Sequence, residues 1–246
     1  METLVAITYI SASAQGNELS LAVEGWRRHF KEPHRILIVG DKPPVEDVDW
    51  LDIPRVPKRN GQYLPALDIC AKLEAVCLYC MDKGIAEFVW ASDDFFAVND
   101  FSLPDVKYPK YYMDEMLSRW DRTQNEFEHT QIKTRRLCER EGFGVTDWTT
   151  HLPMWMDAEK LYWVIQDYNL TEDAQIVENI YYNKFGPKGK PFKLHAGDRF
   201  KYPVRYRTQD LPGLEDAFIN KIWICCSEAG WSEELERELR RHYGIE

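Results

Sequence analysis

The sequence predicts an α/β protein with a mostly parallel, doubly wound sheet flanked by helices. Two observations support this fold class: strand-length apolar runs alternate with helix-length amphipathic segments, and most apolar runs end in polar or glycine-containing loops. No linker, internal repeat or low-complexity tract divides the chain. We therefore expect a single domain spanning residues 1–246.

The first forty residues are typical of a βαβ unit. The run LVAITYI at 4–10 predicts a buried strand, and RILIV at 35–39 predicts a second one that ends at GDKPP. Between them, Asn17 is placed to cap a helix. Its apolar side chains recur at helical spacing and are Leu19, Val23, Trp26 and Phe30.

The pattern continues with a short strand at 50–53, a helix from Pro65 to Gly84 and a buried strand, EFVWA, at 87–91. After residue 100 the chain becomes irregular and then mainly helical. Helices are expected at about 125–141, 157–168, 172–184 and 232–243, with Asp157 as an N-cap.

Composition limits the classes of function. The 246 residues carry 31 Lys and Arg against 41 Asp and Glu, a net charge of −10, which argues against a continuous basic surface for nucleic acid. The 9 Trp, 13 Tyr and 11 Phe exceed what the core requires, so some rings are expected to face a ligand cleft. The six cysteines are interpreted as buried thiols. With no signal peptide or membrane span apparent, we expect a cytoplasmic protein.

The most informative segment is EFVWASDDFFAVND at 87–100. It places Asp93 and Asp94 directly after a buried strand, at the edge where open α/β sheets bind ligands. Adjacent carboxylates between apolar runs need a counter-charge, and oxygen ligands suit Mg²⁺ or Mn²⁺ completed by substrate phosphates. The alternative is a solvated Asp pair at a capped strand end.

An ordered set of segments resembles a known family. The segments are TYI at 8–10, NEL at 17–19, ILIVGDKPP at 36–44, DICAKLEAVC at 68–77, EFVWASDDFFAV at 87–98, THLPMWMDAEKL at 150–161 and NIYYNKFG at 179–186. They resemble glycosyltransferases of bacteria and their phages that are related to the Stealth-type capsular polysaccharide transferases. The chain departs from that pattern at Ser20 and Glu24, where the family has two arginines, and at Asp68 and Ser92, where it has asparagines.

The resemblance implies a GT-A-like (Rossmann-like) fold with a mixed, mostly parallel sheet. Residues 1–100 would then form the half that binds the nucleotide sugar, and 101–246 the half that binds the acceptor. It also implies roles for individual residues. Asp94, His151 and Asp198 would be catalytic, Ile10, Ser11, Asp68, Lys72 and Asp93 would bind the donor, and Asp94 with His195 would hold Mn²⁺ or Mg²⁺.

Several of these residues have a second interpretation. Lys72 meets a diphosphate or pairs with Asp68 on the surface, and His151 is a base or a local hydrogen-bonding group before a proline turn. Tyr181 and Tyr182 stack on a ligand or, more commonly, pack in the core. The basic and aromatic stretch 184–207 binds the donor diphosphate or a nucleic-acid acceptor, or is a solvated loop.

The leading hypothesis is a metal-dependent glycosyltransferase that moves a sugar from a nucleotide-diphosphate sugar to a glycan or a modified nucleic-acid base. The alternatives are a Stealth-type sugar-1-phosphate transferase and a non-catalytic carbohydrate- or nucleotide-binding module. A phage-encoded member would act in the host cytoplasm.

Overall fold

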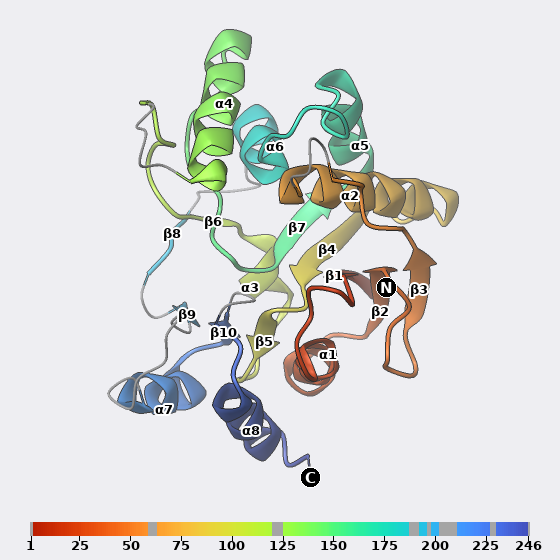
Figure 1. Cartoon of the computed structure of the whole chain (residues 1–246), viewed down its shortest axis with the longest axis vertical. Helices are drawn as coiled ribbons and strands as arrows, with labels where there is room; N and C mark the ends of the chain where they lie inside the picture. Colours follow the sequence, from red (N-terminus) through yellow and green to blue (C-terminus); the bar gives the residue numbers. More distant parts are fainter. Residues whose placement is uncertain are drawn as a thin grey trace.

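A computed structural model describes residues 2–58, 63–119, 125–186, 192–195, 198–201, 211–226 and 230–245. Its main sheet has five strands in the order β3-β2-β1-β4-β7 (Figure 1). These strands are β1 (Thr3–Tyr9), β2 (His34–Gly40), β3 (Asp49–Asp52), β4 (Glu87–Ser92) and β7 (Met154–Asp157).

The predicted α/β class with a mostly parallel sheet is confirmed. β1 pairs in parallel with both β2 and β4, and β2 pairs in parallel with β3. The fifth strand, β7, was not predicted; it runs antiparallel to β4, with Met154 opposite Trp90 and Asp157 opposite Glu87. The sheet is therefore mixed.

Alternating side chains of β1 face two different helical layers. Leu4 and Ala6 pack with α2 (Pro65–Asp82) and α5 (Ala158–Asp167), whereas Val5 and Ile7 pack with α1 (Glu18–His29). Figure 1 shows α1 on one side of the sheet, with α2 and α5 on the other. The apolar β-branched strands thus bury both faces, as expected for a doubly wound sheet.

A smaller layer covers the outer side of α1. Its sheet, in the order β5-β10-β9, comprises β5 (Phe95–Ala97), β10 (Trp223–Cys225) and β9 (Arg199–Lys201), and the helices beside it are α7 (Leu211–Asn220) and α8 (Glu233–His242). Leu235 and Leu239 of α8 pack against Leu21 of α1, and the Tyr243 hydroxyl donates a hydrogen bond of 2.8 Å to the Ala97 carbonyl. The end of the described chain thereby holds β5 in place.

The remaining elements are α3 (Leu103–Lys107), β6 (Lys110–Tyr111), α4 (Glu126–Glu141), α6 (Val177–Phe185) and β8 (Phe192–Lys193). α6 begins later than the predicted start near residue 172. The backbone N–H groups of Glu172 and Asp173 both donate to the Asn169 carbonyl in a turn, and the Ile176 N–H donates to the Thr134 hydroxyl. These contacts delay the helix to Val177.

Two of the predicted details at helix ends differ in outcome. Asp157 caps α5 as predicted, because its carboxylate accepts from the Lys160 N–H at 3.0 Å. Asn17 lies at the N-cap position of α1 but makes no side-chain cap; its amide donates to Glu236 of α8 instead. Tertiary contact therefore replaces the local cap.

The cysteines are all buried, as predicted, and burial raises the pKa of the Cys80 thiol to about 12. Tyr181 and Tyr182 are buried in the core, where they also line a small pocket with Trp155 and Phe185. Four of the aromatic residues, Trp26, Phe30, Phe101 and Trp223, form a buried cluster. Among the described residues, no helix is long and apolar enough to cross a membrane.

Candidate functional site

A pocket opens where the carboxyl ends of β1 and β4 meet. The chain leaves β1 toward β2 on one side, while β4 lies on the other side, so the strand order reverses between them. Open α/β sheets bind ligands at this switch point. The pocket has a volume of about 270 Å³ and is lined mainly by residues at these strand ends and on α1 and α2: Thr8, Tyr9, Ile10, Ser13, Ala14, Glu18, Tyr63, Pro65, Asp68, Ile69, Lys72, Ser92, Asp93 and Asp94.

Five of the residues predicted from the sequence meet in this pocket: Ile10, Asp68, Lys72, Asp93 and Asp94. They come from two strand ends and one helix, yet they line one pocket. A sixth predicted residue, Ser11, lies next to the pocket rather than in its lining.

Ser11 connects the exits of β1 and β2. Its N–H and hydroxyl donate to Oδ2 of Asp41 at 2.8 and 2.5 Å. The hydroxyl hydrogen bond lowers the pKa of Asp41, and the Lys72 and Arg55 charges contribute in the same direction. Ser11 thus fixes the loop that borders the pocket, and its predicted contact with the donor stays a prediction.

The acidic wall of the pocket consists of Glu18, Asp93 and Asp94. Glu18 is only 4% exposed, and its carboxylate accepts from the Gln15 N–H at 2.7 Å. Burial raises the pKa of Asp93 to about 8, and the charges of Asp94 and Glu18 add to the effect. Three carboxylates around one pocket favour a cationic or metal-bound ligand.

Asp94 is also anchored to the smaller sheet. Its backbone carbonyl accepts from the Cys226 N–H at 3.2 Å, next to the β5–β10 pairing of Phe95 with Cys225. This contact fixes the backbone of Asp94, and the residue lines the pocket.

The α2 side of the pocket carries an ion pair within that helix. Lys72 Nζ lies 2.7 Å from Oδ2 of Asp68, with the side chains 1% and 2% exposed, and Oδ1 of Asp68 accepts from the Val56 N–H at 2.8 Å. The sequence interpretation of a surface pair is wrong in one respect, because the pair is buried. Gly40 makes room for it: a Cβ there would lie 3.2 Å from Cε of Lys72.

Two residues near this wall were not predicted. The Arg55 guanidinium lies 3.7 Å from the centroid of the Tyr63 ring. Burial raises the pKa of Tyr63 to about 12, and the Asp68 charge acts in the same direction. Neither residue, nor Glu18, has a distinctive sequence signal, since each depends on contacts formed only in the fold.

His151 lies toward the same edge of the sheet as the acidic pair. Because β7 runs antiparallel to β4 with Met154 opposite Trp90, the segment before β7 returns to the carboxyl end of β4. His151 has a left-handed backbone with φ of 49°, which histidine adopts more readily than most residues. Although the residue has exposed surface, desolvation of its ring lowers its pKa to about 4, with Lys201 and Arg199 contributing.

Arg199 and Lys201 are the described part of the basic stretch closest to this region. They lie on β9, where Lys201 is opposite Cys225 of β10, and Nη1 of Arg199 lies 3.6 Å from Sγ of Cys225. β10 in turn separates them from β5, which follows Asp94 directly. Of the stretch 184–207, residues 187–191, 196–197 and 202–207 lie outside the described part of the chain.

Asp198 and His195 contact each other, and both lie between β8 and β9 in the sequence. Oδ1 of Asp198 lies 2.6 Å from Nζ of Lys110, and Oδ2 accepts from the His195 N–H at 2.7 Å. Both carboxylate oxygens are therefore engaged in local structure. Their predicted roles as base and metal ligand remain predictions.

Within the described residues, no three Asp, Glu, His or Cys side chains gather closely enough to form a metal cage. Mg²⁺, however, is commonly held by one or two carboxylates, several waters and substrate phosphates. Asp93 and Asp94 supply that smaller donor set; burial and, after it, the charges of Asp94 and Glu18 raise the pKa of Asp93, and a bound cation would favour its ionised form. The residues fit a metal bound together with a substrate.

Comparison of the chain with models of known protein families gives no match. A search of curated proteins gives none either. The resemblance to Stealth-related glycosyltransferases therefore remains a prediction from the sequence segments.

Proposed function

We propose that the protein is a metal-dependent glycosyltransferase of GT-A-like type that uses a nucleotide-diphosphate sugar. The main support is the acidic wall of Glu18, Asp93 and Asp94 at the sheet switch point, in a pocket that the buried Lys72–Asp68 pair also lines. A diphosphate entering an acidic pocket needs a cation, and the adjacent carboxylates offer the oxygen ligands for one.

Different residues would bind the metal ion and the nucleoside. Bound Mn²⁺ or Mg²⁺ would neutralise the diphosphate as it departs from the sugar. Asp93 and Asp94 would hold that ion, while the Tyr63 ring, backed by Arg55, offers an aromatic face at the pocket for the nucleoside. Glu18 fixes the start of α1 through Gln15.

His151, although it is not among the residues that line the pocket, is the better candidate of the two predicted bases. Its pKa of about 4 keeps the imidazole neutral at pH 7, so a ring nitrogen can accept a hydrogen bond from an acceptor hydroxyl. Asp198, in contrast, has both oxygens engaged by Lys110 and the His195 N–H.

One observation supports the second candidate, a sugar-1-phosphate transferase. α1 lacks the two arginines of the Stealth-type pattern, but Arg199 and Lys201 bring two cations to the small sheet beside β10. Such cations would suit a reaction at the β-phosphate.

The product released distinguishes the two activities. The protein is incubated with a panel of nucleotide-diphosphate sugars and Mn²⁺, with glycan and oligonucleotide acceptors, and the nucleotide product is identified. Nucleoside diphosphate supports the glycosyltransferase, nucleoside monophosphate supports the sugar-1-phosphate transferase, and nucleotide binding without release supports a binding module.

Asp94→Ala is the matching variant, because the backbone carbonyl that binds Cys226 remains. We expect it to lose turnover while its melting temperature stays near that of the wild type. Asp82→Ala removes an exposed carboxylate at the end of α2 and serves as the control. Wild-type turnover by Asp94→Ala would show that the metal assignment is wrong.

A further inference from the structure

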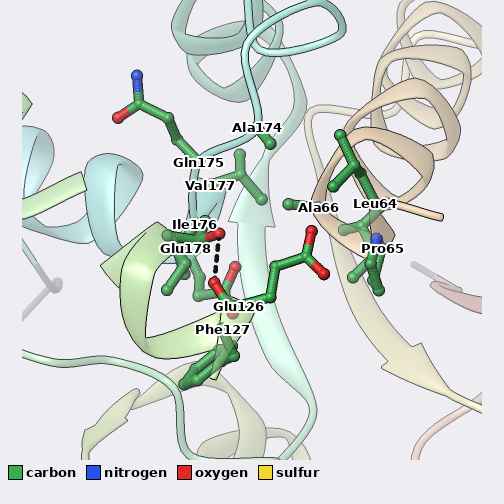
Figure 2. Close-up of a pocket in the computed structure, with 12 residues that line it drawn as sticks. Leu64, Pro65, Ala66, Glu126, Phe127, Ala174, Gln175, Ile176, Val177 and Glu178 are labelled. Carbon is green, nitrogen blue, oxygen red and sulfur yellow. Dashed lines mark hydrogen bonds between the residues drawn. The ribbon is translucent and has the colours of Figure 1, made fainter. Parts of the chain in front are cut away.

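A second pocket adjoins the first along α2. Figure 2 shows this groove between the start of α2, the first turn of α4 and the segment that leads into α6. It has a volume of about 170 Å³ and mainly apolar walls, including Leu64, Pro65, Ile69, Phe127 and Ile176. Phe127 is 49% exposed, although it sits among these apolar neighbours.

The two pockets share part of one wall. Pro65 and Ile69 line both of them, while Asp68 and Lys72, each three residues further along α2, face the switch-point pocket. Ligands that fill the two pockets would therefore approach each other across the same turn of the helix. Such adjacency is what a transfer between a donor and an acceptor requires.

The groove is apolar but carries negative charge. The Glu126 carboxylate belongs to its lining, and Figure 2 shows it extended toward the turn of Leu64 and Ala66. Glu178 also lines the groove, but burial raises its pKa to about 7, so it contributes less charge. The Thr130 hydroxyl donates to the Glu126 carbonyl at 2.9 Å and is thus occupied within the helix. Carboxylates beside apolar walls disfavour a phosphate-rich ligand and tolerate a neutral one.

We propose that this groove binds the apolar portion of an uncharged, hydroxyl-bearing acceptor, such as an aryl glycoside, rather than a nucleic acid. The proposal rests on the proposed function, because it assigns the groove by its contact with the donor pocket. Of the two acceptors that the sequence leaves open, a glycan and a modified nucleic-acid base, the proposal favours the glycan.

The test uses 4-nitrophenyl β-glucoside, methyl β-glucoside and a short single-stranded oligonucleotide as probes, with binding measured by saturation-transfer NMR and calorimetry. We expect the aryl glucoside to bind and the methyl glucoside and oligonucleotide to bind at least about tenfold more weakly. Phe127→Ala should weaken aryl glucoside binding about fivefold, since an aromatic contact is lost. Leu78→Ala, at an equally exposed apolar position of α2 outside the groove, is the matched control and should bind as the wild type does.

Ala174→Phe provides a second test, because the larger ring fills the groove instead of emptying it. Aryl glucoside binding should be lost, while binding of a nucleoside diphosphate with Mn²⁺ stays unchanged in both groove variants. Aryl binding that survives both substitutions, or oligonucleotide binding that Phe127→Ala abolishes, would overturn the inference. Failure of the nucleotide to bind the wild type would instead count against the proposed function, so the two failures are distinguishable.

Discussion

Lys72 and Asp68 form an ion pair inside the protein, 2.7 Å apart and almost fully shielded from solvent, on the wall of the switch-point pocket. A buried pair of this kind is costly to form and costly to break, because removal of one partner leaves the other charge without compensation. The pair therefore affects both the stability of α2 and the charge on the wall of the pocket.

Lys72→Met should lower the free energy of unfolding by about 3 kcal/mol. The double variant Asp68→Asn/Lys72→Met should recover most of that loss, because the asparagine carbonyl can still accept from the Val56 N–H. Urea unfolding of the wild type and both variants measures the difference. Equal stability of the single and double variants would contradict a charge-based penalty.

Asp93 should make the protein less stable as the pH rises. Its pKa in the folded state is raised to about 8 from an ordinary value near 3.8, so the folded form holds the proton more tightly than the unfolded chain does. Stability from this group is present below about pH 4 and is lost as the pH rises toward 8. Asp93→Asn should reduce the fall in unfolding free energy between pH 5 and pH 7.5 by about 3 kcal/mol.

Urea unfolding at the two pH values tests this effect. Part of the slope should remain in Asp93→Asn, since burial also raises the pKa of Glu178, to about 7. Asp82→Asn, at an exposed position, is the control and should keep the wild-type slope. An unchanged slope in Asp93→Asn would mean that its carboxyl group is ionised in the fold.

Lys201→Gln should raise the pKa of His151. Desolvation of the ring accounts for most of the lowered value of about 4, and the Lys201 charge is the next contribution. Removing that cation should shift the NMR titration midpoint of the His151 ring upward by up to about half a unit. Lys193→Gln removes a lysine that pairs with Asp114 instead and should leave the midpoint in place. Equal midpoints in wild type and Lys201→Gln would show that the Lys201 charge does not affect the His151 ring.

Gly40→Ala should be among the most damaging small substitutions. Gly40 has φ of 133°, and a Cβ would lie 2.0 Å from the Tyr9 carbonyl oxygen. We expect a loss of about 3 kcal/mol in unfolding free energy, through strain and displacement of the strand end. Gly84 also has a positive φ, of 66°, but open space around it, so Gly84→Ala should cost only about 1 kcal/mol. Similar losses in the two variants would show that the steric contact at Gly40 is unimportant.

The periodicity of the sequence was enough to predict the parallel part of the sheet. LVAITYI, RILIV and EFVWA are continuous apolar runs because both of their faces are covered, and they became β1, β2 and β4. The position of Asp93 and Asp94 after β4 followed from the same pattern. The local pattern predicts these strands because a strand that is buried on both faces consists of consecutive apolar residues.

Only the tertiary structure decided which side chains share the pocket. Glu18 joins Asp93 across more than seventy residues, Tyr63 stacks with Arg55, and β7 brings His151 back toward the end of β4. The burial of the Lys72–Asp68 pair likewise depends on Gly40 of another strand. A sequence by itself determines where chain segments are apolar and where they turn, whereas the meeting of charges is fixed by strand order and packing between distant segments.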